Sequence, residues 1–159
     1  MIAMQEIRKA LTRILKDEAE FPYEVHFDNV KDSSKSYFYI EIDSKRRTFD
    51  RVYYERSLSV DIQLRLLPDK NDRIHRSELY AAADKLDCTI RPIVKVEDRY
   101  ITVLDIRSRI ASDILHYEFK LDFADYLPIA QPERMETLDL NLKTGNFEMK
   151  LEEETEDGE

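Results

Sequence analysis

The chain has 159 residues, a length typical of one domain with a single core. Charged residues make up 37% of it and the net charge is −9, but six acids in the last nine residues leave only −3 to residues 1–150. A free-standing nucleic-acid-binding protein normally carries a basic excess, so this balance argues against that class. No apolar run approaches the ~18 residues of a membrane span, and we expect no membrane partner.

Glycine is almost absent, since the chain has only Gly145 and Gly158. Phosphate-binding loops and dinucleotide-binding turns need glycine where the backbone approaches phosphate, so the sequence excludes both. The single cysteine, Cys88, rules out an intrachain disulfide framework and fits a reducing cytosol. Because Cys88 follows the apolar face of a predicted helix, we expect a buried and inert thiol.

An apolar stripe at three- and four-residue steps predicts a first helix over residues 2–18. The stripe consists of Met4, Ile7, Leu11, Ile14 and Leu15. A short strand is predicted at 23–27, after Pro22. Another begins near Tyr37, where Phe38, Ile40 and Ile42 share one face.

The clearest element is a strand over residues 51–66, in which apolar and polar side chains alternate. Only Arg56 interrupts its apolar row, which otherwise consists of Val52, Tyr54, Leu58, Val60, Ile62, Leu64 and Leu66. Alternation over this length indicates a half-buried strand of an antiparallel sheet. Because the mean strand has only ~5–6 residues, we expect the 51–55 end to project toward a neighbouring molecule.

A second helix is predicted at 73–87, followed by strands at 93–96, 99–107 and 113–125. The apolar face of this helix consists of Leu79, Ala82, Ala83 and Leu86. The whole order predicts a single α+β domain over residues 1–128, with an antiparallel or mixed sheet and two helices packed on one face. Beyond it lie a Pro-bounded extension at 129–150, with the strand-like alternation of Leu138, Leu140 and Leu142, and an acidic tail at 151–159, which we expect to be disordered.

Candidate catalytic residues are few. His26, His75 and His116 are scattered without the spacing of metal ligands, so we expect neither a metal nor a cofactor. One pattern remains an alternative: Pro68-Asp69 and Glu118-Phe119-Lys120 imitate the set with which metal-dependent nucleases hold magnesium and position a lysine. We nevertheless expect a protein that is not an enzyme.

A basic cluster lies between two predicted strands and consists of Lys45, Arg46, Arg47 and Arg51. It is either a solvated hairpin loop or a contact to phosphate or to an acidic partner surface. No aromatic residue is interleaved among Lys45, Arg46 and Arg47, so nothing in this run indicates that nucleic-acid bases are read.

Taken as a whole, the chain resembles the tail terminator (tail completion) proteins of phages and phage-like particles of Gram-positive bacteria. The resemblance covers about residues 4–143 and rests on five segments in order. These are MQEIRKALTRIL, RVYYERSLSVDIQLRLLPDKNDR, HRSELYAAADKLD, DRYITVLDIRSRIASDILHYEFKLDFADYL and ERMETLDLNLK.

The resemblance implies a structural protein that forms a homo-hexameric ring on the head-proximal end of the tail tube. Such a ring stops tube polymerisation and offers a surface for head joining, and it brings no catalytic residues. The implied partners are the tube protein, the head-tail connector, the sheath protein if the tail is contractile, and DNA only as it passes through the ring. The implied location is the particle tail, after assembly in the bacterial cytoplasm. A small adaptor that binds a host protein through its acidic tail stays open as a further alternative.

Overall fold

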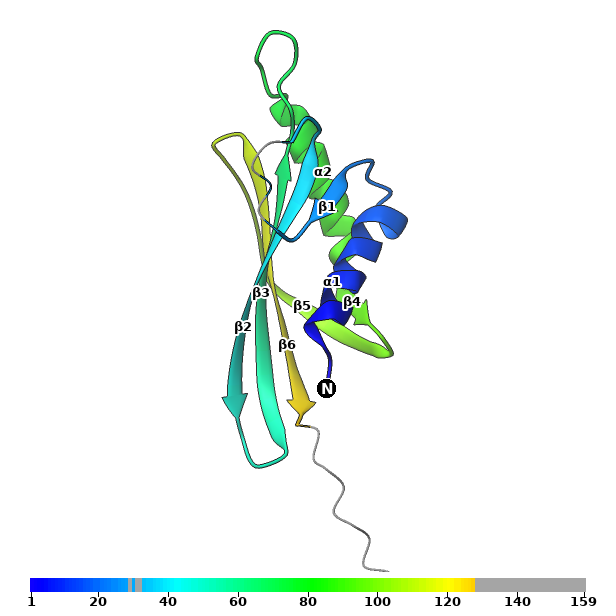
Figure 1. The fold of residues 1–159 in the computed structure, drawn as a ribbon, viewed down its shortest axis with the longest axis vertical. Coiled ribbons are helices and arrows are strands. Elements are labelled where there is room, and N and C mark those ends of the chain that lie inside the picture. Colours follow the sequence, from blue (N-terminus) through cyan, green and yellow to red (C-terminus); the bar gives the residue numbers. More distant parts are fainter. Residues whose placement is uncertain (29, 31–32, 128–159) are drawn as a thin grey trace, which may run out of the picture. The chain divides into compact units, whose positions relative to one another are not determined.

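The computed structural model describes residues 1–28, 30 and 33–127. Two helices and a six-stranded mixed sheet make up this part, as Figure 1 shows. The helices are α1 (Met4–Arg13), continued by the π-helical turn η1 (Ile14–Glu18), and α2 (Arg76–Ile90). The strands are β1 (Glu24–His26), β2 (Tyr37–Thr48), β3 (Tyr53–Arg65), β4 (Ile93–Val96), β5 (Arg99–Ala111) and β6 (Ile114–Tyr126). The predicted α+β class is confirmed, while the extension and tail predicted from 129 onward lie outside the described residues.

The sheet has the strand order β1-β2-β3-β6-β5-β4. Only β1 pairs in parallel, with β2, and every other pair is antiparallel. In the central pair, Tyr53 lies opposite Tyr126 and Arg65 opposite Ile114, so β3 and β6 are matched over their whole lengths. The sheet therefore has a continuous centre made of β2, β3 and β6.

The core lies between the sheet and the helices. On β3, Leu58, Val60, Ile62 and Leu64 are at most 1% exposed, so the predicted apolar row faces inward. The stripe of α1 and η1 and the apolar face of α2 cover this row in one hydrophobic cluster. Both helices lie on the same side of the sheet in Figure 1. The other face carries the polar members of each alternation.

Two predicted boundaries differ from the structure for local reasons. Helix α2 begins at Arg76 rather than near 73, because Asp69 accepts hydrogen bonds from the amides of Asn71 and Arg73 and holds the preceding segment in a turn. Strand β5 continues to Ala111 rather than ending at 107, because the positive φ angles of Ser112 and Asp113 join it to β6 by a two-residue turn.

Candidate functional site

The basic cluster is not the hairpin loop that the sequence suggested. Lys45, Arg46 and Arg47 belong to β2 itself, and only Arg51 lies in the turn to β3. The correction has a physical reason: β3 is long enough to pair with every one of these residues, up to Thr48 opposite Tyr54. All four side chains are exposed. They form the basic hairpin end, whose turn extends past the start of α1 in Figure 1.

Exposed aromatic side chains accompany the basic hairpin end. Phe49 in the turn is 61% exposed, and Tyr53 at the start of β3 is 55% exposed. Tyr126 lies directly opposite Tyr53 and is 52% exposed. Aromatic residues and arginine are enriched in protein interfaces relative to other surface, so this end has the composition of a contact surface.

Arg56, the one polar residue in the apolar row of β3, is buried and hydrogen-bonded. Its guanidinium donates to the backbone oxygen of Ile2 at 2.7 Å, to Ser44 Oγ at 3.3 Å and to the sulfur of Met4. Burial lowers the pKa of Arg56 from its ordinary value. The residue therefore ties the segment before α1 to the sheet.

Asp125 on β6 holds the same segment from its other side. Its carboxylate accepts a hydrogen bond from the Ile2 amide at 2.8 Å and one from the Tyr54 hydroxyl at 3.3 Å. Burial by itself would raise the pKa of Asp125, but the amides of Ile2 and Tyr126 and the nearby terminal ammonium hold it below its usual value. Arg56 and Asp125 together serve the fold, and neither is free to act on a ligand.

On the outer face of the sheet, Asp61, His116 and Glu118 form a half-buried group whose ligand atoms lie within 4.8 Å of one another. His116 Nδ1 is 2.9 Å from Asp61 Oδ2, which also accepts a hydrogen bond from Gln63 at 2.9 Å. Carboxylate and imidazole are common metal ligands. Here, however, Arg109 donates to Glu118 at 3.0 Å, so each member already has a protein partner.

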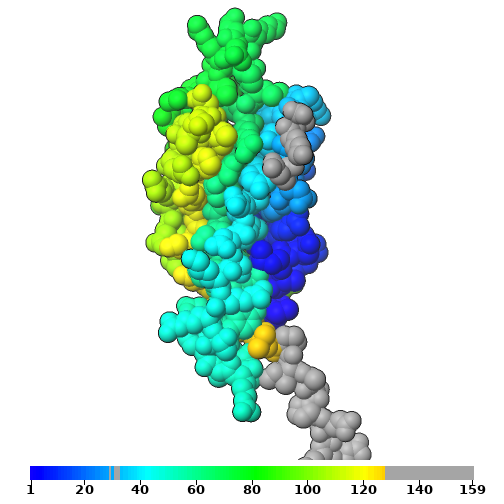
Figure 2. All heavy atoms as spheres, turned by 60° about the vertical axis from the view of Figure 1, so that its left-hand side comes forward, coloured from blue at the N-terminus to red at the C-terminus, as the bar shows by residue number. Residues whose placement is uncertain are grey.

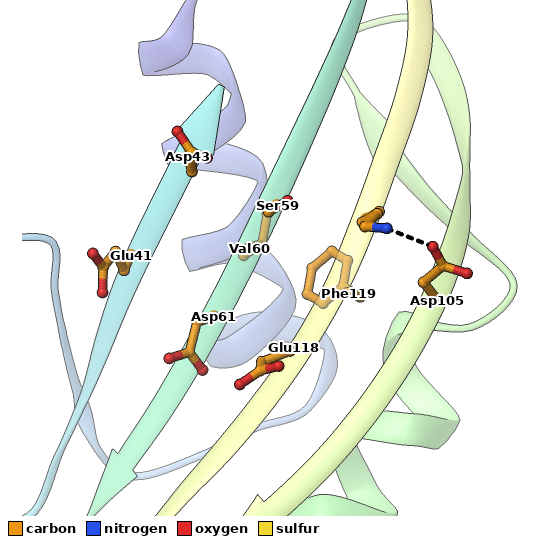
Figure 3. Close-up of a pocket in the computed structure, with 9 residues that line it drawn as sticks. Glu41, Asp43, Ser59, Val60, Asp61, Asp105, Glu118 and Phe119 are labelled. Atoms are coloured by element: carbon orange, nitrogen blue, oxygen red, sulfur yellow. Dashed lines mark hydrogen bonds and ion pairs between the residues drawn. The ribbon is translucent and has the colours of Figure 1, made fainter. Parts of the chain in front are cut away.

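Beside this group the outer face is hollowed, with a cavity of about 260 Å³. Figure 3 shows Glu41 and Asp43 on β2 on one side of it and Glu118 on β6 on the other, with Ser59 and Asp61 of β3 between them. Lys120 and Asp105, at the remaining edge, form an ion pair of 2.7 Å. The small side chain of Ser59 leaves the space. The result is an acidic hollow in an otherwise regular strand surface.

The nuclease pattern is not assembled by the fold. Glu118 and Lys120 do share a strand face, but Lys120 is paired with Asp105. Asp69 is tied into the turn before α2, where it accepts two backbone hydrogen bonds and lies 3.3 Å from His75. In the described residues, the group with metal-ligand geometry contains Glu118 but not Asp69. The two carboxylates and the lysine of the pattern, Asp69, Glu118 and Lys120, thus each have a different partner.

Two residues have surroundings that differ from those expected from the sequence. Cys88 is exposed, whereas we expected a buried thiol, because its position on α2 lies away from the face formed by Leu79, Ala83 and Leu86. The sequence shows no metal-ligand spacing around His116. The β3–β6 register brings it to Asp61 across 55 residues of sequence, and only the shared alternation of the two strands hints at this.

In the part of the chain that the structure describes, no helix is long and apolar enough to cross a bilayer. No curated protein matches the sequence. A solved structure aligns along its full length with 82% of this chain, at 16% identity and a TM-score of 0.44, a likeness too weak to carry an argument.

The family comparison covers most of the chain. Residues 6–133 match the family described as phage tail terminator protein, and this range includes all the described strands and α2. It also contains the basic hairpin end, Arg56, Asp125 and the acidic hollow. A match over most of the chain identifies its family. The chain therefore belongs to the phage tail terminator family, whose members are structural proteins of the phage tail.

Proposed function

We propose that this protein closes as a homo-hexameric ring on the head-proximal end of a phage or phage-like tail tube. The ring stops tube polymerisation and offers the surface to which the head connector attaches. The observation that carries this proposal is the family match over residues 6–133. The number six comes from the resemblance to other tail terminators.

The features of the surface support an assembly role. The β2–β3 hairpin ends in exposed basic and aromatic side chains, which suit contacts to a neighbouring subunit or to the tube. A body of weak net charge with both signs on its surface suits closed interfaces of complementary charge. In this proposal Lys45, Arg46, Arg47 and Arg51 contact another protein, either a second copy or the tube protein. DNA passes through the ring without being read.

The test is a particle that lacks this protein. We expect tails of irregular and excessive length that do not join heads, because tube growth then has no stop signal. Electron microscopy of purified particles measures the length distribution, and supplying the wild-type protein in trans should restore it. Tails of normal length that still join heads in its absence would contradict the proposal.

The charge-reversed double variant Arg46→Glu/Arg47→Glu sharpens this test. It should also give overlong tails, since it removes the proposed contact. Because Arg46 also lies over the ring of the buried Tyr54, a melting curve of the variant confirms that it folds. The matched control is Lys70→Glu/Arg73→Glu, which makes the same change in charge in the exposed turn before α2. Normal tails are expected with this control.

A further inference from the structure

Charges without partners lie in two places along the same strand. In the described part of the chain, no ion pair engages Lys45, Arg46, Arg47 or Arg51. Within the same described residues, Glu41 and Asp43, at the acidic hollow, also lack one. All six side chains are exposed. One strand region thus carries unpaired positive charge and the adjacent region unpaired negative charge.

The acids of the hollow are placed against one another. Glu41 is opposite Asp61 in the β2–β3 pairing, and Asp61 is opposite Glu118 in the β3–β6 pairing. Three carboxylates therefore occupy neighbouring positions across three strands. Like charges directly opposite each other destabilise a sheet. A cation placed over this row would relieve the repulsion.

Within the described residues, Arg109 already pairs with Glu118 and His116 Nδ1 lies 2.9 Å from Asp61, whereas Glu41 and Asp43 have no such partner. Glu41 and Arg47 are six residues apart on β2, which corresponds to about 20 Å along an extended strand. Pairing with β3 keeps the strand extended over this distance. Arg47 is thus held away from Glu41, and Lys45, which is two residues from Asp43 on the same strand face, forms no ion pair with it in the described residues. The hairpin end of a second molecule has no such restriction.

Both surfaces are accessible to a second copy. Figure 2, which brings the outer side forward, shows strand atoms at the surface, with α1 visible only along one edge. The hairpin turn extends past the start of α1 in Figure 1. Its basic and aromatic side chains are exposed. Charge complementarity and access point to the same arrangement.

We propose that the basic hairpin end of one copy docks on the acidic outer face of the next copy, with Lys45 and Arg47 facing Glu41 and Asp43. Phe49 and Tyr53 add apolar contact area beside the charges. The contact joins two unlike surfaces, and repetition of such a heterologous contact around an axis closes a ring. The inference rests on the proposed ring and identifies the surfaces that build it.

Two charge-reversed variants test the pairing. Lys45→Glu/Arg47→Glu makes the hairpin end acidic, and Glu41→Lys/Asp43→Lys makes the outer face basic. Each variant alone then presents two surfaces of like charge. In an equimolar mixture, every hairpin end meets an outer face of opposite charge. We expect each variant alone to stay monomeric and the mixture to regain the mass of the wild-type assembly with equal numbers of both.

Native mass spectrometry at low salt measures this, first in solution and then on material released from tail tubes. Rising salt should dissociate the wild-type assembly, because the charges lie at an exposed interface. The control Lys70→Glu/Arg73→Glu should assemble like wild type. Melting curves confirm folding, and Lys45→Gln/Arg47→Gln replaces the acidic variant if that one does not fold.

Assembly of either variant alone, or a mixture that stays monomeric while wild type assembles, would overturn the pairing. So would a wild-type protein that is monomeric both in solution and on tubes. Overlong tails in the absence of the protein, together with normal tails for both variants, would leave the capping function standing and refute only this interface. Conversely, rescue in the mixture with normal tails in the absence of the protein would support the interface and refute capping.

Discussion

The two faces of β3 differ in burial and in role. Its inner face, with Leu58, Val60 and Ile62, is sealed under the helices and at most 1% exposed. Its outer face presents Ser59 and Asp61 at the acidic hollow. The inner face specifies how the chain folds, whereas the outer face can change without disturbing the core. We therefore expect substitutions on the inner face to lower the stability of the fold, and substitutions on the outer face to impair assembly.

The largest expected effect comes from a charge on the inner face. Val60→Asp places an unpaired carboxylate at a position that is 1% exposed, at a cost of several kcal/mol. That cost is comparable with the whole stability of about 5–15 kcal/mol of a typical domain, so we expect no folded protein. Circular dichroism and a melting curve measure this.

The matched control is Ser59→Asp, the adjacent residue on the outer face. It should fold with a loss of less than about 1 kcal/mol, which reflects only the neighbouring carboxylates. A Val60→Asp protein that melted like wild type would mean that the two faces of β3 have been assigned the wrong way round.

A second test concerns the only arginine in the inner row. Arg56→Ala removes the donor that holds the Ile2 carbonyl, while Asp125 keeps the terminal ammonium and Arg99 nearby. Leaving a buried carbonyl without its charged donor costs about 1–3 kcal/mol. Chemical denaturation measures the difference. Arg47→Ala, an exposed arginine on the outer side of β2, should change the free energy of unfolding by less than about 0.5 kcal/mol.

Asp125 adds a dependence on pH to the same comparison. Because its pKa is lower in the folded protein than in the unfolded chain, its stabilising contribution is full above the unfolded value of about 3.9. The contribution is lost as the pH falls through the folded value. Asp125→Asn should therefore destabilise the protein by about 1 kcal/mol at pH 7 and flatten its acid unfolding profile. The exposed Asp122→Asn should keep the wild-type profile, and identical profiles for all three proteins would refute this role.

The smallest effect is expected from the acidic end. Deletion of residues 151–159 removes six acids and a single apolar residue, Leu151, which offers little to offset the entropy of ordering. The free energy of unfolding should change by less than about 0.5 kcal/mol. A large loss would show that these residues pack on the domain. Assembly of the deletion variant tests separately whether they compete with the acidic hollow for the basic hairpin end.

Much of the fold follows from periodicity. The alternation at 58–64 predicts the inner face correctly, and the stripe from Ile7 to Leu15 predicts the helix that covers it. These are local signals, since each needs only the spacing of apolar residues along one element. The bounds of β2 were missed because Lys45–Arg47 has no apolar alternation. Pairing with β3, and not its own composition, makes this segment a strand.

The site was less predictable because it depends on register. Asp61 and His116 are 55 residues apart, and only the pairing of β3 with β6 brings them to 2.9 Å. Similarly, Arg56 read as an interruption because its partners, Ile2 and Met4, are contributed by a segment 52 to 54 residues away. A single sequence shows which faces are polar. It does not show which polar residues meet.

The hydrogen bonds that Arg56 and Asp125 make to Ile2 also affect how the domain is completed during synthesis. Asp125 is separated from Ile2 by 123 residues, and β6, the last strand of the described residues, pairs with β3 at the centre of the sheet. A chain emerging from the ribosome therefore exposes the apolar stripe of α1 long before its last anchor is available. Contacts so distant in sequence form late and slow folding. The start of the chain becomes fixed only once β6 has been released, so truncated chains that end before Asp125 should be poor competitors for assembly.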